Sequence, residues 1–178
     1  MRGCSRLVSC QSAMKPGSDV PCAAPRPRQG QPSLRFVTRA KVHVDRIATA
    51  WAIRRFVDPD ASFEFIDRNR DPTELVAIPF DMRGVELGHH GGKCTFEVLL
   101  EKYELRDPAL RCMGAIIRAI DVPLDDESPA ALVELAAAFD KIRDSAISDD
   151  ERLIQGGLLC EELYAGCGGA GKGAANRR

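Results

Sequence analysis

The chain has 178 residues and a formal net charge of −1, which suits one globular domain that needs no disulfides. Its hydrophobic fraction of 44% comes without any run of about 18 consecutive apolar residues, so we expect no membrane span and no membrane partner. No apolar run of about 7–15 residues follows Arg2 and Arg6, as it would in a signal peptide, and we therefore predict a cytoplasmic protein.

Charge is unevenly distributed along the chain. Residues 1–34 have a net charge of +4 and residues 166–178 of +3, which leaves −8 for the segment between them. Neutralisation of phosphates dominates non-specific binding to nucleic acid, and an acidic domain cannot supply it. We therefore expect no direct DNA binding by this chain.

The two ends of the chain lack the apolar periodicity of a folded core. Residues 1–34 contain five prolines and five serines and are predicted to be a disordered leader. Residues 166–178 are rich in glycine, alanine and arginine and are predicted to be a disordered tail. The folded domain is expected at residues 35–165.

The first half of this domain has the composition of a small sheet. Residues 34–44 are rich in β-branched and aromatic residues and predict a strand, and a helix with Asp45 as its N-cap should follow and end before Asp58-Pro59. Phe63 and Phe65 alternate with polar residues in a second strand. Residues 80–87 predict a third strand.

Helices dominate the second half. Thr95 is a fair N-cap for the next helix, and Asp107-Pro108 and Ser128-Pro129 each combine a capping residue with proline in the first turn. A last helix is expected over residues 150–164, although it contains Gly156 and Gly157. This order predicts an α/β fold of α+β-like character, in which a small sheet near the N-terminal half is covered by about five helices.

The first candidate site segment contains His43 and Asp45. In a strand these residues would point to the same side, where an imidazole and a carboxylate could form half of a metal site or an acid/base pair. The alternative is that Asp45 only caps the helix and that His43 is a partly buried surface residue.

The second segment is a glycine-rich turn that contains His89, His90 and Lys93. It opens a helix at Thr95, and the free N–H groups of a helix N-terminus attract anions. The turn could therefore hold an oxyanion, a metal through His89 or His90, or both. Adjacent side chains alternate in direction, so we expect only one histidine to face inward and select His89. The alternative is a turn with solvated histidines.

Three further residues are candidates for chemistry. Cys94 lies beside Lys93 before a helix start, which lowers the pKa of a thiol and would favour a redox or metal-binding role. Glu97 in the first turn either interacts favourably with the helix dipole or reaches a metal. Asp121 follows the next helix, where an acid is unfavourable without another use, and it is a candidate ligand.

Four runs of sequence resemble the C-terminal domain of bacterial chromate-resistance proteins of the ChrB type. They are residues 36–58, 79–82 (Pro-Phe-Asp-Met), 88–97 (Gly-His-His-Gly-Gly-Lys-Cys-Thr-Phe-Glu) and 107–110 (Asp-Pro-Ala-Leu). The resemblance implies a link to chromate-responsive gene regulation. Longer members carry an additional N-terminal domain, and because residues 1–34 are too short to form it, we do not expect a transcription factor.

Three functional hypotheses follow, and they leave open whether the protein is an enzyme. The first is a sensor or accessory domain that binds chromate or a related oxyanion through Arg39, Lys41, Arg46 and Lys93, the cations nearest to the predicted site. The second is a metal-dependent enzyme in which a divalent metal is held by ligands among His43, Asp45, His89, His90 and Asp121, with Glu97 as general base. The third is thiol-dependent chromate reduction by Cys94.

Overall fold

The computed structural model describes residues 32–121 and 127–170, and the described part confirms the predicted fold class. A small sheet occupies the N-terminal half, and five α-helices cover it. The elements in chain order are β1 (Arg35–Arg39), α1 (Val44–Ala52), the π-helical segment η1 (Ile53–Val57), β2 (Ser62–Ile66), the 3-10 turn η2 (Pro72–Glu74), β3 (Ile78–Pro79), α2 (Thr95–Lys102), α3 (Pro108–Ile120), α4 (Ala130–Asp144) and α5 (Asp149–Gly166). Most of the leader and tail predicted at residues 1–34 and 166–178 lies outside the described residues.

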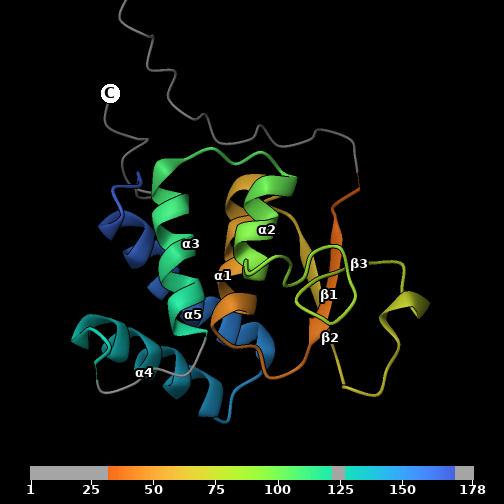
Figure 1. Cartoon of the computed structure of the whole chain (residues 1–178). Coiled ribbons are helices and arrows are strands. Elements are labelled where there is room, and N and C mark those ends of the chain that lie inside the picture. Colours follow the sequence, from red (N-terminus) through yellow and green to blue (C-terminus); the bar gives the residue numbers. More distant parts are fainter. Residues whose placement is uncertain (1–31, 122–126, 171–178) are drawn as a thin grey trace, which may run out of the picture.

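The sheet has the strand order β2-β1-β3, and both outer strands run parallel to β1. Side chains of β1 alternate between two buried faces: Phe36 packs against the helices, whereas Val37 packs with Ile66 and Met82 on the other face. Figure 1 shows the five α-helices on one side of the sheet and η2 on the other. Parallel strands bring their carboxyl ends to one edge, where ligands of open α/β sheets gather.

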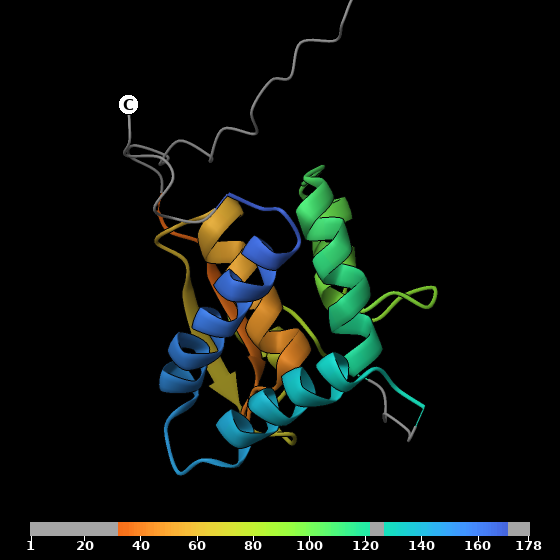
Figure 2. The same cartoon turned by 90° about the vertical axis from the view of Figure 1, so that its left-hand side faces the viewer.

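The helical layer packs mainly around α1. Figure 2 shows α5 lying along α1 and α4 running across one end of the layer. The core includes Ile47 and Trp51 of α1, Phe96 of α2, Leu110 of α3 and Phe139 of α4, all of which are buried. Within residues 32–121 and 127–170, no helix combines the length and apolarity that crossing a bilayer requires.

The first predicted strand is shorter than expected, and its helix starts earlier. Lys41 adopts a left-handed backbone conformation (φ 60°), and the backbone N–H groups of Lys41 and Val42 donate to the Asp149 carboxylate. These bonds turn the chain, so that α1 begins at Val44 with His43 as N-cap. The prediction of Asp45 as N-cap is therefore wrong, as is the placement of His43 and Asp45 on one side of a strand.

The third predicted strand, over residues 80–87, is also wrong in extent. Strand β3 covers only Ile78–Pro79, after which Asp81 adopts φ 48° and its N–H donates to the carbonyl of Leu87 (2.8 Å). Residues 81–87 therefore form a turn whose two ends are joined by this hydrogen bond. Two caps also differ by one residue, because Cys94 rather than Thr95 precedes α2, and Pro129 rather than Ser128 precedes α4.

Replacing either of two adjacent glycines of α5 with alanine should change the stability of the domain in opposite directions. A Cβ atom at Gly156 would lie 2.5 Å from Cγ2 of Ile47, whereas one at Gly157 would contact Cδ1 of Trp51 at an ordinary 3.8 Å. We expect Gly156→Ala to destabilise the domain by about 1–3 kcal/mol through overpacking. Gly157→Ala should instead stabilise it by up to about 1 kcal/mol, because alanine is the better helix former.

Urea unfolding of the two variants beside the wild type measures this difference. The same direction of change in both variants would contradict the close approach of α5 to α1 at Gly156.

Candidate functional site

The Asp45 carboxylate lies at the centre of the candidate site. Its side chain is buried in the first turn of α1, and its two oxygens accept hydrogen bonds from the backbone N–H groups of Thr95 (2.8 Å) and Phe96 (2.9 Å). Asp45 therefore caps α2, a helix about 50 residues further along the chain, rather than its own. Hydrogen bonds and the helix dipole both stabilise a negative charge at this position.

His89 joins Asp45 to two further carboxylates. Its Nε2 lies 3.0 Å from Asp45 Oδ2, 3.3 Å from Asp81 Oδ1 and 3.6 Å from Asp121 Oδ2. The hydrogen bond to Asp45 and the surrounding carboxylates raise the pKa of His89 to about 9. Burial and the nearby Asp45 raise the pKa of Asp121 to about 6. At neutral pH a protonated His89 is thus the cation around which the three acids gather.

Asp81 belongs to this cluster, although it is not among the site residues predicted from the sequence. Its carboxylate pairs with Nε of Arg46 at 2.7 Å and accepts a hydrogen bond from Oγ1 of Thr95 at 2.9 Å. Burial, followed by repulsion from Asp45, raises its pKa. The feature of the sequence that could have identified Asp81 is its position one residue beyond buried Phe80, at the carboxyl end of a parallel strand, where ligands gather.

Three potential metal ligands lie close together. One side-chain ligand atom each of Asp45, His89 and Asp121 lies within 4.8 Å of the others. Among the described residues, these three form the group of histidine, cysteine or acidic side chains that is close enough to share a metal ion. The structure therefore brings together three of the five predicted metal ligands, including a histidine selected from an adjacent pair.

The other two predicted ligands contact different groups. His43 Nε2 lies 3.0 Å from Oδ1 of Asp140 on α4, and burial lowers the pKa of His43. His90 instead bonds through Nε2 to the carbonyl oxygens of Val85 (2.9 Å) and Glu86 (3.1 Å). The structure thus places neither imidazole in the Asp45 cluster.

A wide groove of about 1540 Å³ runs past this cluster along the carboxyl ends of the strands. His89 and Asp81 line it, so the cluster and the groove share residues. Its lining includes six basic side chains: Arg39, Lys41, Arg46, Arg68, Arg83 and Arg143. Three of the four predicted oxyanion ligands are among them. The groove is thus a basic surface on an otherwise acidic domain.

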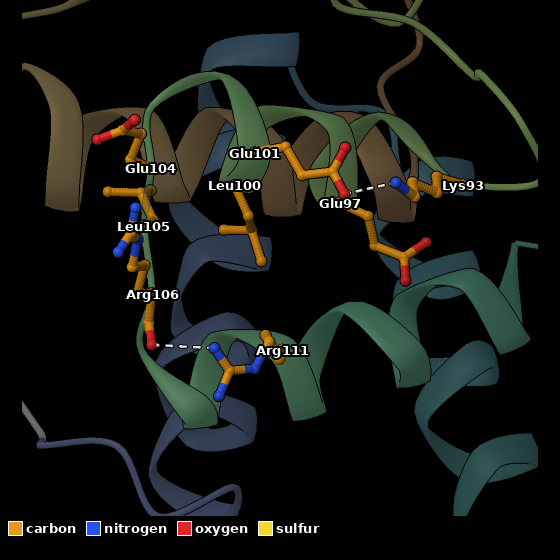
Figure 3. Close-up of a pocket in the computed structure, with 8 residues that line it drawn as sticks. All are labelled: Lys93, Glu97, Leu100, Glu101, Glu104, Leu105, Arg106 and Arg111. Atoms are coloured by element: carbon orange, nitrogen blue, oxygen red, sulfur yellow. Dashed lines mark hydrogen bonds and ion pairs between the residues drawn. The ribbon is translucent and has the colours of Figure 1, made fainter.

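Lys93, the fourth predicted oxyanion ligand, faces away from the groove. Its ammonium pairs with Glu101, and both residues line a pocket between α2 and α3 (Figure 3). The same pocket contains Glu97, whose carboxylate accepts the N–H of Cys94 and lies 3.5 Å from Arg118. Glu97 therefore completes the cap of α2 and is not part of the Asp45 grouping.

Cys94 does not have the properties of a reactive thiol. It is 1% exposed, and burial, followed by repulsion from Asp45, raises its pKa well above the ordinary value. The expected lowering of its pKa is wrong, because Lys93 points to Glu101 and the carboxylates dominate its surroundings. A thiolate is the nucleophilic form of cysteine, so this position disfavours direct reaction with chromate.

The raised pKa of His89 predicts a pH-dependent stability in metal-free protein. A histidine whose pKa is higher in the folded state contributes stability that is fully present below about 6.5 and is lost as the pH rises through about 9. The difference in unfolding free energy between wild type and His89→Gln should therefore narrow over this range.

Urea unfolding in EDTA at several pH values measures the narrowing. His90→Gln is the matched control, because its ring bonds to carbonyl groups rather than to carboxylates. A difference between wild type and His89→Gln that stays constant up to pH 10 would contradict the ion cluster.

Comparison with known proteins confirms the resemblance seen in the sequence. The family model described as ChrB, C-terminal domain, matches residues 36–167. The curated Protein ChrB of Cupriavidus metallidurans is 34% identical over 147 residues, which are 82% of this chain and 44% of that protein. The chain therefore spans less than half the length of this relative. No solved structure matches the chain.

Proposed function

Because the chain belongs to the chromate-resistance family of the ChrB C-terminal domain, we propose that it is a sensor or accessory domain that binds chromate or a related oxyanion in the basic groove. Chromate is a tetrahedral dianion, and guanidinium groups bind such oxyanions through charge-assisted hydrogen bonds. The observation that carries the proposal is the convergence of six basic side chains at one edge of the sheet.

Three of these cations are the strongest candidates for direct contact. Lys41, Arg68 and Arg83 have no carboxylate within 4.0 Å among residues 32–121 and 127–170, whereas Arg46 pairs with Asp81 and Arg143 with Asp140. Arg39 has no carboxylate partner there either, but its guanidinium already donates to the carbonyl oxygens of Asp67 and Arg70. An anion can therefore reach the first three without displacing an existing ion pair. The paired arginines hold the walls of the groove in place and add to its positive potential.

Titration with chromate, molybdate and sulfate at fixed ionic strength tests this proposal, because salt screens charge–charge attraction. We expect Arg68→Gln and Arg83→Gln each to weaken chromate binding about tenfold, as the loss of roughly 1.4 kcal/mol of charge-assisted hydrogen bonding would. Arg106→Gln is the matched control, since this exposed arginine lines the pocket between α2 and α3 instead. Equal weakening in all three variants would indicate non-specific attraction and contradict a groove site.

A second candidate function is divalent-metal binding, which is favoured by the grouping of Asp45, His89 and Asp121. Carboxylate and imidazole ligands together suit zinc and other divalent transition metals. Asp45 already accepts two backbone N–H bonds, but a carboxylate has further lone pairs, so it can also contact a cation. Binding would release the proton held by His89 and replace one positive charge with another.

Metal analysis of protein purified without a histidine tag separates the two candidates. Stoichiometric metal that is lost in His89→Gln and Asp121→Asn, but kept in His90→Gln, would support the metal site. Protein without metal that is stabilised by chromate would support the oxyanion site alone. An enzyme activity at the metal site would depend on a general base, and Glu97 is engaged elsewhere.

A further inference from the structure

Two cysteines far apart in the sequence meet where the end of α5 lies beside the start of α3. Cys112 is exposed on α3, and Cys167 is half-buried as the C-cap of α5. The two side chains are close enough to interact electrostatically, which makes them neighbours across the two helix ends. The other two cysteines among the described residues, Cys94 and Cys160, are buried in the core.

A contact between other side chains fixes the same two helix ends. The hydroxyl of Tyr164 on α5 donates to Oδ2 of Asp107, the residue that caps α3. Cys167 follows Tyr164 by three residues and Cys112 follows Asp107 by five, so about one helical turn separates each cysteine from this contact. In Figures 1 and 2 the end of α5 accordingly lies next to the first half of α3.

We propose that Cys112 and Cys167 form a reversible intramolecular disulfide when the protein meets a peroxide-class oxidant. Because the Tyr164–Asp107 contact already holds the two helix ends together, neighbouring thiols there need only a short movement to reach bonding distance. This inference is independent of the oxyanion and metal sites.

The chemistry proceeds in two balanced steps. The exposed Cys112 thiolate attacks one oxygen of a hydroperoxide, the O–O bond breaks, and Cys112 sulfenic acid and an alcohol form (water, where the oxidant is hydrogen peroxide). The Cys167 sulfur then attacks the sulfenic sulfur, the S–O bond breaks, and water leaves with the Cys167 proton. Two thiols are oxidised by two electrons, and one peroxide is reduced.

The surroundings of the two thiols suit different roles. Exposed Cys112 meets an oxidant from solution first. Partial burial, followed by the interaction with Cys112, raises the pKa of Cys167 to about 12, so Cys167 stays protonated and acts second. The resulting bond would close the chain from residue 112 to residue 167 and join α3 to α5 covalently.

Peptide mapping of the full chain treated with equimolar hydrogen peroxide tests the proposal. Trypsin releases residues 112–118, and additional cleavage after glutamate separates Cys167 from Cys160, which precedes Glu161. We expect the peptides of Cys112 and Cys167 to be recovered joined, with the loss of two hydrogen atoms, and to be freed by dithiothreitol. A parallel sample with Cys4, Cys10 and Cys22 replaced by serine should give the same product.

Thermal unfolding provides a second measurement. Oxidation should raise the Tm of wild type and of the matched control Cys160→Ala by several degrees, because a long closed loop restricts the unfolded chain. The increase should be absent in Cys112→Ser. Because Cys112 is exposed, this variant should keep the fold, which circular dichroism verifies. Recovery of Cys112 in another pairing, or only as sulfinic or sulfonic acid, would overturn the proposal.

Discussion

Replacing Asp45 with alanine should lower the free energy of unfolding by about 3–5 kcal/mol, as removal of one partner from a buried charged network does. The buried carboxylate holds the first N–H groups of α2 and pairs with His89, so its loss leaves buried donors unsatisfied. Relief of repulsion with Asp81 and Asp121 offsets part of this loss. Asp45→Asn keeps the shape and one acceptor oxygen, and we expect an intermediate loss.

Chemical denaturation of the metal-free variants measures this effect. Asp140→Ala is the control, because that half-buried aspartate forms only solvent-accessible pairs with His43 and Arg143 and should contribute about 1 kcal/mol or less. Losses of equal size at Asp45 and Asp140 would show that the Asp45 carboxylate does not hold α1 and α2 together.

Trp51→Ala should cost about 3–5 kcal/mol, the usual range for truncating a large buried aromatic side chain. The indole is 7% exposed and packs against the rings of Phe56 and Tyr164, each with its centroid 5.6 Å away. Its Nε1–H donates to Glu161 at 3.0 Å, so the variant also removes a hydrogen bond. The free energy of unfolding of Trp51→Phe should lie between those of Trp51→Ala and the wild type.

Urea unfolding gives the magnitude, and Val76→Ala, at a position that is 88% exposed, should change stability by less than about 0.5 kcal/mol. Since Trp51 is the single tryptophan, its fluorescence reports on this position alone. A native emission maximum typical of solvent-exposed indole would contradict the burial.

Elements with local signals were the ones that sequence could predict. Asp107 caps α3 through the N–H of Ala109 two residues away, and Pro108 occupies the first turn, as the dipeptide indicated. Alternation around Phe63 and Phe65 likewise predicted β2, and the apolar positions of Ile47 and Trp51 predicted the buried face of α1. These signals lie within one turn or one strand.

The parts of the site that depend on distant partners could not be read in this way. By local rules Asp45 is a good N-cap for its own helix. Its actual partners are Thr95 and Phe96, and the sequence near Asp45 does not predict them. His43 pairs with Asp140, 97 residues away, on a helix that had no predicted role in the site. The apolar composition of residues 80–87 predicts a strand that would contain Asp81, so the sequence does not indicate that β3 ends just before this residue.

The cluster draws its side chains from α1, the turn after β3, the glycine-rich loop and the end of α3, so no short segment of the chain contains it. Such a site exists only while the whole domain is folded. A ligand that binds there therefore stabilises every segment at once through mass action, rather than ordering one loop. Occupancy should accordingly slow amide hydrogen exchange in α1, α2 and α3 together, and a proteolytic fragment that ends before Asp121 should neither hold the ligand nor gain protection from it.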